Sequence, residues 1–256
     1  MTNRRRVELI EKYLRDHRYA DLHTLSTRFR ISVSTVRRAL DELESRGSAR
    51  RHHGGASAID SDEVAREYDF IARDQRNADE KFVMARFIAE RVLPGMTVII
   101  DGGTSPYAVA RLLIGKRLNV ITNSLPVAGL LSDVSSIETI VTGGTIHNRI
   151  GVLVGPHCDE MLERVHADIA ILGAVGVTAE GMWAHNPPIA ATQKRMVEAA
   201  DQCIFAVDHS KFGRKAPILA TGFAENHTIV TDSEPPAEVA AAMRAARATL
   251  ALCPRG

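Results

Sequence analysis

The chain has 256 residues, which is enough for one large domain or two modest ones. Its 45% hydrophobic and 25% charged residues are ordinary for a globular protein, and no run approaches the roughly 18 apolar residues of a membrane span. Cys158, Cys203 and Cys253 form neither a CxxC pair nor a zinc pattern, and the Arg-rich first residues do not resemble a secretory signal. We therefore expect a cytoplasmic protein with no membrane partner, no cofactor and no metal.

The formal net charge of +1 conceals an asymmetry along the chain. Residues 1–55 carry 13 Lys and Arg against 7 Asp and Glu, a net charge of +6, whereas the remainder carries 19 against 24, a net charge of −5. A small basic block ahead of an acidic body is typical of a polyanion-binding module joined to a sensor. A solvated basic surface would explain the charge alone equally well.

Three short helical patterns occupy the N-terminal segment. Apolar residues at helical spacing mark the first, and Asp21 is placed to cap the second. A third runs from about Val33 to Arg46, with Gly47 after it as a C-terminal capping residue. The apolar positions of the three helices are Val7, Ile10, Leu14, Leu22, Leu25, Phe29, Val36, Leu40 and Leu43. This order, with a tight turn before the third helix, predicts a helix-turn-helix.

A recognition helix presents its outward N-terminal residues to the major groove of DNA. The third helix offers hydroxyl groups and two arginines there, and Arg pairs with guanine edges and with phosphates alike. The segment from Ser48 to Gly55 is predicted to form a β-wing whose arginines lie near the DNA backbone. Its His52 and His53 do not indicate a metal site, because no second pair of ligands has suitable spacing. The predicted DNA-binding residues are Ser34, Thr35, Arg37, Arg38, Arg50 and Arg51.

The run ISVSTVRRALDELESRGSARRHHGGAS resembles the signature of the DeoR family. That family shows a VS-x-TIRRDL recognition helix and then a Gly-led wing that ends in R-x-HGGA. Ala39 stands here where the family usually has Asp, and Val36 replaces Ile. The resemblance implies a winged helix-turn-helix that binds a double-stranded DNA operator.

We expect three parts: the DNA-binding domain at 1–56, a partly helical linker at 57–80, and an effector-sensing and oligomerisation domain at 81–256. The linker is polar and charged and contains neither Gly nor Pro. In the third part, β-branched runs alternate with helical patterns, which predicts an α/β fold with a mostly parallel sheet. The expected strands are Val98–Asp101, Asn119–Asn123, Ile137–Thr142, Asp168–Val177, Gln202–Asp208 and His227–Asp232.

Ligands of such sheets bind beyond the carboxyl ends of the strands. Three loops there are rich in Gly, Ser and Thr, and in the first of them Ser105 and Pro106 suit the N-cap and first position of a helix. Glycines let the backbone approach a ligand, and a helix N-terminus favours an anion. Lys211 follows a strand and suits a phosphate, Asp208 suits a sugar hydroxyl, and Lys194 is a second candidate on a helix. The predicted effector-binding residues are Asp101, Gly102, Gly103, Thr104, Ser105, Thr122, Asn123, Gly143, Gly144, Lys194, Asp208 and Lys211.

These loops also resemble the DeoR sensor domain, whose marks are a D-x-GTT loop, a TN, a GG and a D-x-SKFG. The resemblance implies a fold similar to ribose-5-phosphate isomerase and CoA-transferase relatives, and a phosphorylated sugar or related metabolite as the effector. Ser105 replaces the usual second Thr, and Ala190 stands where relatives usually have Glu. The chain is therefore expected to be a repressor of carbohydrate catabolism genes, released from DNA by its effector. Paired half-sites imply a homo-oligomer, either a dimer or a tetramer.

Two other functions stay open at this point. An isomerase-like enzyme would draw on Asp101, Asp168 and Asp208 with Lys194 or Lys211 as acid and base groups. The sequence shows no nucleophile elbow or metal set, however, and an isomerase has no need of a helix-turn-helix. An architectural DNA-binding protein with an inert second domain is the other alternative.

Overall fold

The computed structural model describes residues 3–17, 19–46, 48–52, 54–58, 70–148 and 150–253. The chain divides into two compact units, Met1–Tyr68 and Asp69–Gly256, each of which has its own core. Within the described ranges, no helix is both long and apolar enough to cross a membrane.

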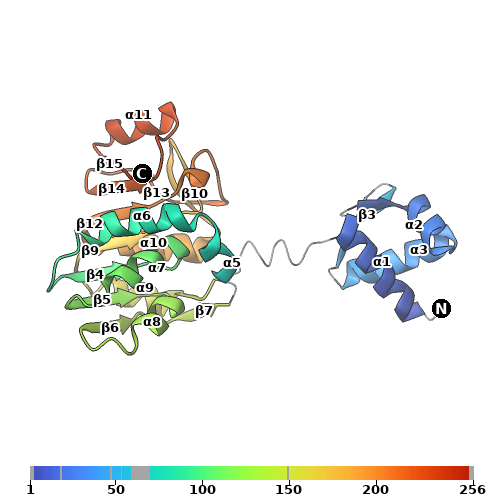
Figure 1. The fold of residues 1–256 in the computed structure, drawn as a ribbon, viewed down its shortest axis with the longest axis horizontal. Helices are drawn as coiled ribbons and strands as arrows, with labels where there is room; N and C mark the ends of the chain where they lie inside the picture. The colour runs from blue at the N-terminus through green and yellow to red at the C-terminus, as the bar shows by residue number, and fades with distance from the viewer. Residues whose placement is uncertain are drawn as a thin grey trace. The chain divides into compact units, whose positions relative to one another are not determined.

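The first unit has the predicted helix-turn-helix and wing (Figure 1). Its elements are α1 (Asn3–His17), β1 (Tyr19–Asp21), α2 (Leu22–Phe29), α3 (Val33–Ser45), β2 (Ala49–His52) and β3 (Gly55–Ala58). The apolar positions expected on α1 and α3 are buried and meet in one core with Leu25 of α2. Strands β2 and β3 pair antiparallel as the wing, and β1 adds to β3 as a strand that the sequence did not predict.

Side-chain caps set the starts of α2 and α3. The Asp21 carboxylate accepts a hydrogen bond from the backbone N–H of Thr24 at 2.8 Å, as the sequence predicted. The Ser32 hydroxyl accepts one from Thr35 N at 3.2 Å. Each bond satisfies an N–H group that the helix itself leaves free. Gly47, the expected C-terminal cap of α3, lies outside the described residues.

The second unit alternates strands and helices. Its helices are α5 (Phe70–Gln75), α6 (Ala78–Ala89), α7 (Thr104–Leu113), α8 (Leu125–Leu131), α9 (Pro156–Leu162), α10 (Pro187–Glu198), the 3₁₀ helix η1 (His209–Lys211) and α11 (Ala237–Ala245). Its strands are β4 (Thr97–Ile100), β5 (Leu118–Thr122), β6 (Ile137–Val141), β7 (Thr145–His147), β8 (Val152–Val154), β9 (Ala167–Leu172), β10 (Gly176–Thr178), β11 (Gly181–Ala184), β12 (Ala200–Ala206), β13 (Ile218–Thr221), β14 (His227–Thr231) and β15 (Thr249–Leu252).

Among the described residues, seven parallel strands form the central sheet in the order β15-β14-β12-β9-β4-β5-β6. Successive residues of a strand face opposite sides, so Val98 and Ile100 join one core and Ile99 joins the other. Helices α6, α7 and α8 cover the first face, and α9, α10 and α11 cover the second (Figure 1). The predicted α/β class with a mostly parallel sheet is confirmed.

Several details differ from the prediction. The edge strand β15 of the central sheet was not predicted, and neither were the short strands β7, β8, β11 and β13. The segment Asp168–Val177 is not one strand, because β9 ends at Leu172 and β10 belongs to a small antiparallel sheet with β11 and β13. Helix α7 begins two residues before Pro106, with Gly103 as its N-cap in place of Ser105. Residues 70–80 of the expected linker form α5 and the start of α6 within the second unit, while residues 59–69 lie outside the described ranges.

Candidate functional site

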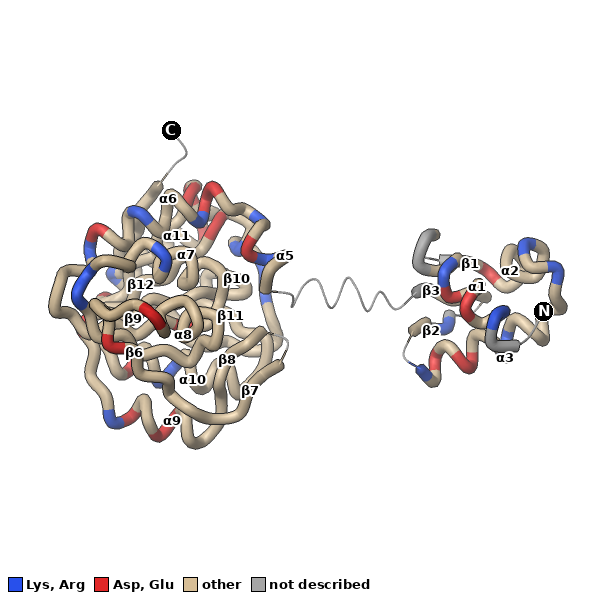
Figure 2. The backbone as a smooth tube through the Cα atoms, turned by 60° about the horizontal axis from the view of Figure 1, so that its bottom comes forward, with Lys and Arg blue, Asp and Glu red and all other residues tan. Residues whose placement is uncertain are grey.

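The N-terminal half of α3 carries most of the predicted DNA-binding residues. Ser34, Arg37 and Arg38 are exposed, and the acidic residues of α3 are confined to its second half, as the tube of Figure 2 shows. Thr35 is half-buried, and its hydroxyl lies 2.8 Å from that of Ser32, so it also supports the cap. The exposed end of α3 is therefore basic and hydroxyl-rich.

The wing is tied to α3 through Arg51. Its guanidinium donates to the carboxylate of Asp41, and its backbone N–H donates to Glu44 Oε1 at 3.1 Å. Ala39, which replaces the family's Asp, is buried in the core of this unit. Arg50 lies in β2, but its side chain is outside the described part of the chain.

In the second unit, the predicted effector residues collect at the carboxyl edge of the sheet. The backbone N–H of Gly102 donates to Asp101 Oδ1 at 2.7 Å and to Asn123 Oδ1 at 3.0 Å, which joins the loops after β4 and β5. Thr122 donates its hydroxyl to the carbonyl of Ile100 and accepts the N–H of Ser124, so its polar atoms serve the fold. The structure thus brings the first two predicted loops together.

Asp101 is the most perturbed carboxyl group at this edge. It is 2% exposed, and burial raises its pKa to about 6, although hydrogen bonds from Gln193 and from the Gly102 backbone act to lower the pKa. Gln193 Nε2 lies 2.7 Å from Asp101 Oδ2 and 3.1 Å from the carbonyl oxygen of Gly173. Gln193 was not predicted from the sequence, and α10 places it inward next to the exposed Lys194.

The glycines of these loops are needed by the chain's own packing. A Cβ on Gly102 would lie 2.0 Å from Val152 Cγ1, and one on Gly144 would lie 2.7 Å from the carbonyl oxygen of Val154. Both contacts come from β8, which folds across the loops after β4 and β6. Gly103 and Gly143 have φ values of +143° and +73°, which favour glycine for its backbone freedom. Thr104 and Ser105 are buried in the first turn of α7.

Asp208 is the N-cap of η1, which follows β12, and Lys211 is the last residue of η1. Asp208 Oδ1 accepts hydrogen bonds from Ser210 N at 3.0 Å and from Asn77 Nδ2 at 2.8 Å. Burial tends to raise the pKa of Asp208, but the hydrogen bonds from Ser210 and the charge of Lys211 outweigh it, and the pKa is lowered. Its other oxygen, Oδ2, is buried without a hydrogen-bond partner in the described structure.

Lys81 is a buried cation that was not predicted from the sequence. It is 5% exposed and donates to the carbonyl oxygens of Arg73 and Arg76, at the end of α5. Burial lowers its pKa to about 8, although the charges of Asp208 and Asp74 act in the opposite direction. Lys81 therefore links the end of α5 to the group around Asp208.

Two residues considered from the sequence lie elsewhere. The side chain of Lys194 is 66% exposed and lies 3.8 Å from Glu198 on the surface of α10. Asp168 accepts a hydrogen bond from Thr97 N at 2.8 Å, at the amino ends of β9 and β4. Asp168 is thus at the opposite edge of the sheet from Asp101 and Asp208.

Comparisons with known proteins cover both units. Residues 6–62 match the DeoR-like helix-turn-helix domain, and residues 76–233 match the DeoR C terminal sensor domain. The glycerol-3-phosphate regulon repressor of Escherichia coli K12 is 31% identical over 237 residues, which cover 92% of this chain and 93% of that protein. The HTH-type transcriptional regulator GlpR of Haloferax volcanii is 34% identical over 232 residues, covering 90% of this chain and 88% of the relative.

Among solved structures, ribose 5-phosphate isomerase A from Methanocaldococcus jannaschii aligns with 53% of this chain and 54% of its own, with 19% identity and a TM-score of 0.40. The sequence relatives cover almost the whole chain and are regulators of transcription, not enzymes.

Proposed function

Because the chain belongs to the DeoR family of transcriptional regulators, we propose that it represses carbohydrate catabolism genes and leaves its operator when a phosphorylated metabolite binds the second unit. The helix-turn-helix unit supplies DNA binding, and the sensor domain supplies the effector site. An architectural protein with an inert second domain would not need the buried polar groups found at the carboxyl edge of the sheet.

For DNA binding, α3 would enter the major groove with Ser34, Arg37 and Arg38 toward the bases and phosphates. Arg51 and Arg50 of the wing would lie along the backbone, with Thr35 supporting the cap. One helix-turn-helix reads only a half-site, and half-sites lie about 34 Å apart or at multiples of that spacing. A dimer or tetramer is therefore part of the proposal.

The concentration of positive charge around Lys211 carries the effector proposal. Burial lowers the pKa of Lys211, Asp208 opposes this, and the charges of Arg214, Arg73 and Arg76 lower the pKa further. A phosphate group placed here would relieve that mutual repulsion and accept charge-assisted hydrogen bonds. The backbone amides at the N-terminus of α7, beside Thr104 and Ser105, offer a further anion-binding element on the same edge.

The same residues offer a route from effector to operator. Asn77, with φ of +52° before α6, donates to Asp208, and Lys81 holds the end of α5. Helix α5 is the first described element of the second unit and follows the segment that leads from the first unit. An effector that engages Asp208 and Lys211 would change what holds α5. To shift the ratio of the DNA-released state to the DNA-binding state from 1:99 to 99:1, the free energies with which the effector binds these two states must differ by about 5.5 kcal/mol.

A thermal-shift screen tests the effector class. The panel pairs glycerol 3-phosphate, hexose phosphates and pentose phosphates with their unphosphorylated counterparts, and a ligand at 100 Kd should add about 2.7 kcal/mol of stability. We expect only phosphorylated compounds to stabilise the protein and Lys211→Gln to remove the effect. Lys215→Gln is the matched control, because Lys215 is exposed and lies 2.9 Å from Glu180. A panel without any shift would contradict the proposed sensor.

Gel-shift titration tests the DNA surface, with an operator first isolated from genomic fragments by selection on the full-length protein. Arg38→Ala is expected to abolish specific binding. Arg46→Ala should leave it within a few-fold, because Arg46 lies beyond the far end of α3 and pairs with Glu42. Unchanged affinity of Arg38→Ala would refute its assigned role.

The coupling is tested by Asn77→Gly, because glycine keeps the positive φ and removes only the side chain. We expect this variant to bind the operator but to need at least tenfold more effector for release. Arg247→Gly also replaces a residue with positive φ, and its side chain pairs only loosely with Glu225, at 3.7 Å. Equal release by both variants and the wild type would remove Asn77 from the route.

A further inference from the structure

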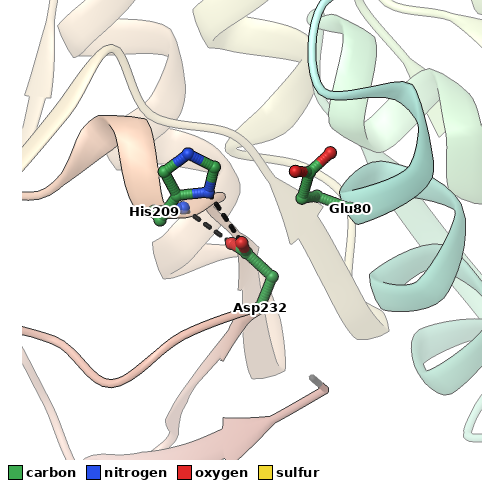
Figure 3. A group of neighbouring side chains, drawn as sticks. All are labelled: Glu80, His209 and Asp232. Carbon is green, nitrogen blue, oxygen red and sulfur yellow. Dashed lines mark hydrogen bonds and ion pairs between the residues drawn. The ribbon is translucent and has the colours of Figure 1, made fainter. Parts of the chain in front are cut away.

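Three side chains with metal-ligand chemistry meet beside, but not within, the proposed effector site. His209 begins η1 after β12, and Asp232 directly follows β14, which is the parallel neighbour of β12. Glu80 comes from the first turn of α6, which contacts both strands. Figure 3 shows the Glu80 side chain extending from α6 toward the other two. One potential ligand atom from each residue lies within 4.8 Å of those of the other two.

The backbone fixes the orientation of the His209 and Asp232 side chains. The backbone N–H of His209 donates to Asp232 Oδ1 at 2.6 Å, and the ring Nδ1 lies 2.7 Å from Oδ2. Both carboxylates are shielded, because Glu80 is 6% exposed and the Asp232 side chain 9%, whereas the His209 side chain is 47% exposed. The cluster is therefore closed on its carboxylate side and open to solvent at the imidazole.

The charge balance of the cluster favours a cation. The carboxylates of Glu80 and Asp232 face a single imidazole ring, and the potential ligand atoms of the three residues lie within 4.8 Å of one another. The neighbouring ammonium group of Lys211 acts on Asp208, which is not one of the three candidate ligands. Shielded carboxylates that converge in this way are stabilised when a cation binds between them.

We propose that Glu80, His209 and Asp232 form a binding site for a divalent transition-metal ion, with Zn²⁺ as the best match. One imidazole nitrogen and two carboxylate oxygens suit Zn²⁺, and three protein ligands leave a fourth position for water. At bond lengths of about 2.0–2.1 Å, tetrahedral ligand atoms stand about 3.3 Å apart, so shifts on the order of 1 Å would bring the three atoms into place. The ion would bind α6 to the ends of β12 and β14.

Zinc titration of the untagged, chelator-treated full-length protein tests the site. The metal content after dialysis against Zn²⁺ in a weak chelator is expected to be about one ion per folded chain, because each ligand set holds one ion. His209→Ala and Glu80→Gln should each lower the affinity at least about 100-fold, because loss of an outer-shell partner alone costs 10–100-fold. His166→Ala is the matched control, because His166 forms an exposed pair with Asp201 at 3.4 Å. This control should bind zinc like the wild type.

A second measurement does not depend on the variants folding. The Co²⁺-loaded wild-type protein should show the weak visible absorption of nitrogen and oxygen ligands. It should lack a thiolate charge-transfer band, since Cys158, Cys203 and Cys253 are buried and none of them belongs to the cluster. A thiolate band would overturn the proposal, as would equal zinc affinity in the wild type and His209→Ala. A wild-type protein that binds no zinc would mean that His209 and Asp232 form only an ion pair.

Discussion

Replacing Gly102 with Ala tests how the loop after β4 is held. The backbone of Gly102 is not in the positive-φ region, so alanine meets no conformational penalty there. Its Cβ, however, would lie 2.0 Å from Val152 Cγ1, whereas carbon atoms in contact stay about 3.5–4.0 Å apart. Strand β8 or the loop must therefore move by about 1.5 Å, and overpacking of this kind costs about 1–3 kcal/mol.

A double-mutant cycle isolates this contact. Val152→Ala removes the clashing Cγ1 and leaves the Val152 Cβ position 3.3 Å from the new methyl group, which requires only a small adjustment. Gly102→Ala and Val152→Ala should each destabilise the protein. The double variant should be about 1–3 kcal/mol more stable than the sum of the two effects predicts.

The free energies of unfolding come from urea denaturation followed by circular dichroism, at one protein concentration because the protein is expected to be an oligomer. Gly129→Ala is the control, since no atom lies within 4 Å of its added Cβ and alanine favours the helix α8. The packing argument would be refuted if the stability cost of the double variant equals the sum of the costs of Gly102→Ala and Val152→Ala to within about 0.5 kcal/mol.

Three further variants test separate features by the same denaturation assay. Ser32→Ala removes the N-cap of α3 and should cost about 1 kcal/mol, while Ser45→Ala at the other end of the helix should cost less; equal costs would contradict the capping role. Burial raises the pKa of Asp101 to about 6, so as pH falls the folded state binds a proton at this carboxyl before the unfolded state does. The contribution of Asp101 to the free energy of unfolding therefore decreases as pH rises from about 4 to 6. Asp101→Asn should therefore gain up to about 3 kcal/mol relative to the wild type between pH 4 and pH 7, and a constant difference would contradict this. Burial lowers the pKa of His227, whose ring nitrogens have no hydrogen-bond partner among the described residues, so the unfolded state is protonated first and stability falls as pH drops below about 6.5. His227→Leu should flatten that loss, and an unchanged slope would assign it to other groups.

The sequence predicted the fold well where side-chain periodicity reports burial. The faces of α1 and α3 and six of the seven strands of the central sheet follow from apolar residues spaced to match a helix or a strand, whereas the edge strand β15 was not predicted. Short strands were not predicted, because a three-residue strand such as β1 or β10 is defined by its pairing with a partner strand and has no periodic pattern of its own. The prediction of Ser105 as the N-cap was wrong, because a hydroxyl residue before Pro is only a local signal. The chain contacts Val152 of β8 at Gly102, and α7 begins directly after the next residue, Gly103.

The proposed effector site shows more clearly what a sequence can and cannot reveal. Residues at strand ends are conspicuous because each directly follows an apolar run, and Asp101, Asn123 and Asp208 were chosen as candidates in this way. Gln193 and Lys81 lie within helices, where a polar residue is expected on the solvent face, and nothing in the spacing says which of Gln193 and Lys194 turns inward. That choice depends on partners distant in sequence, since Gln193 reaches Asp101 and Lys81 reaches the end of α5. A charged or amide side chain is buried only where such partners satisfy it, so its role becomes visible once the fold has brought those partners together.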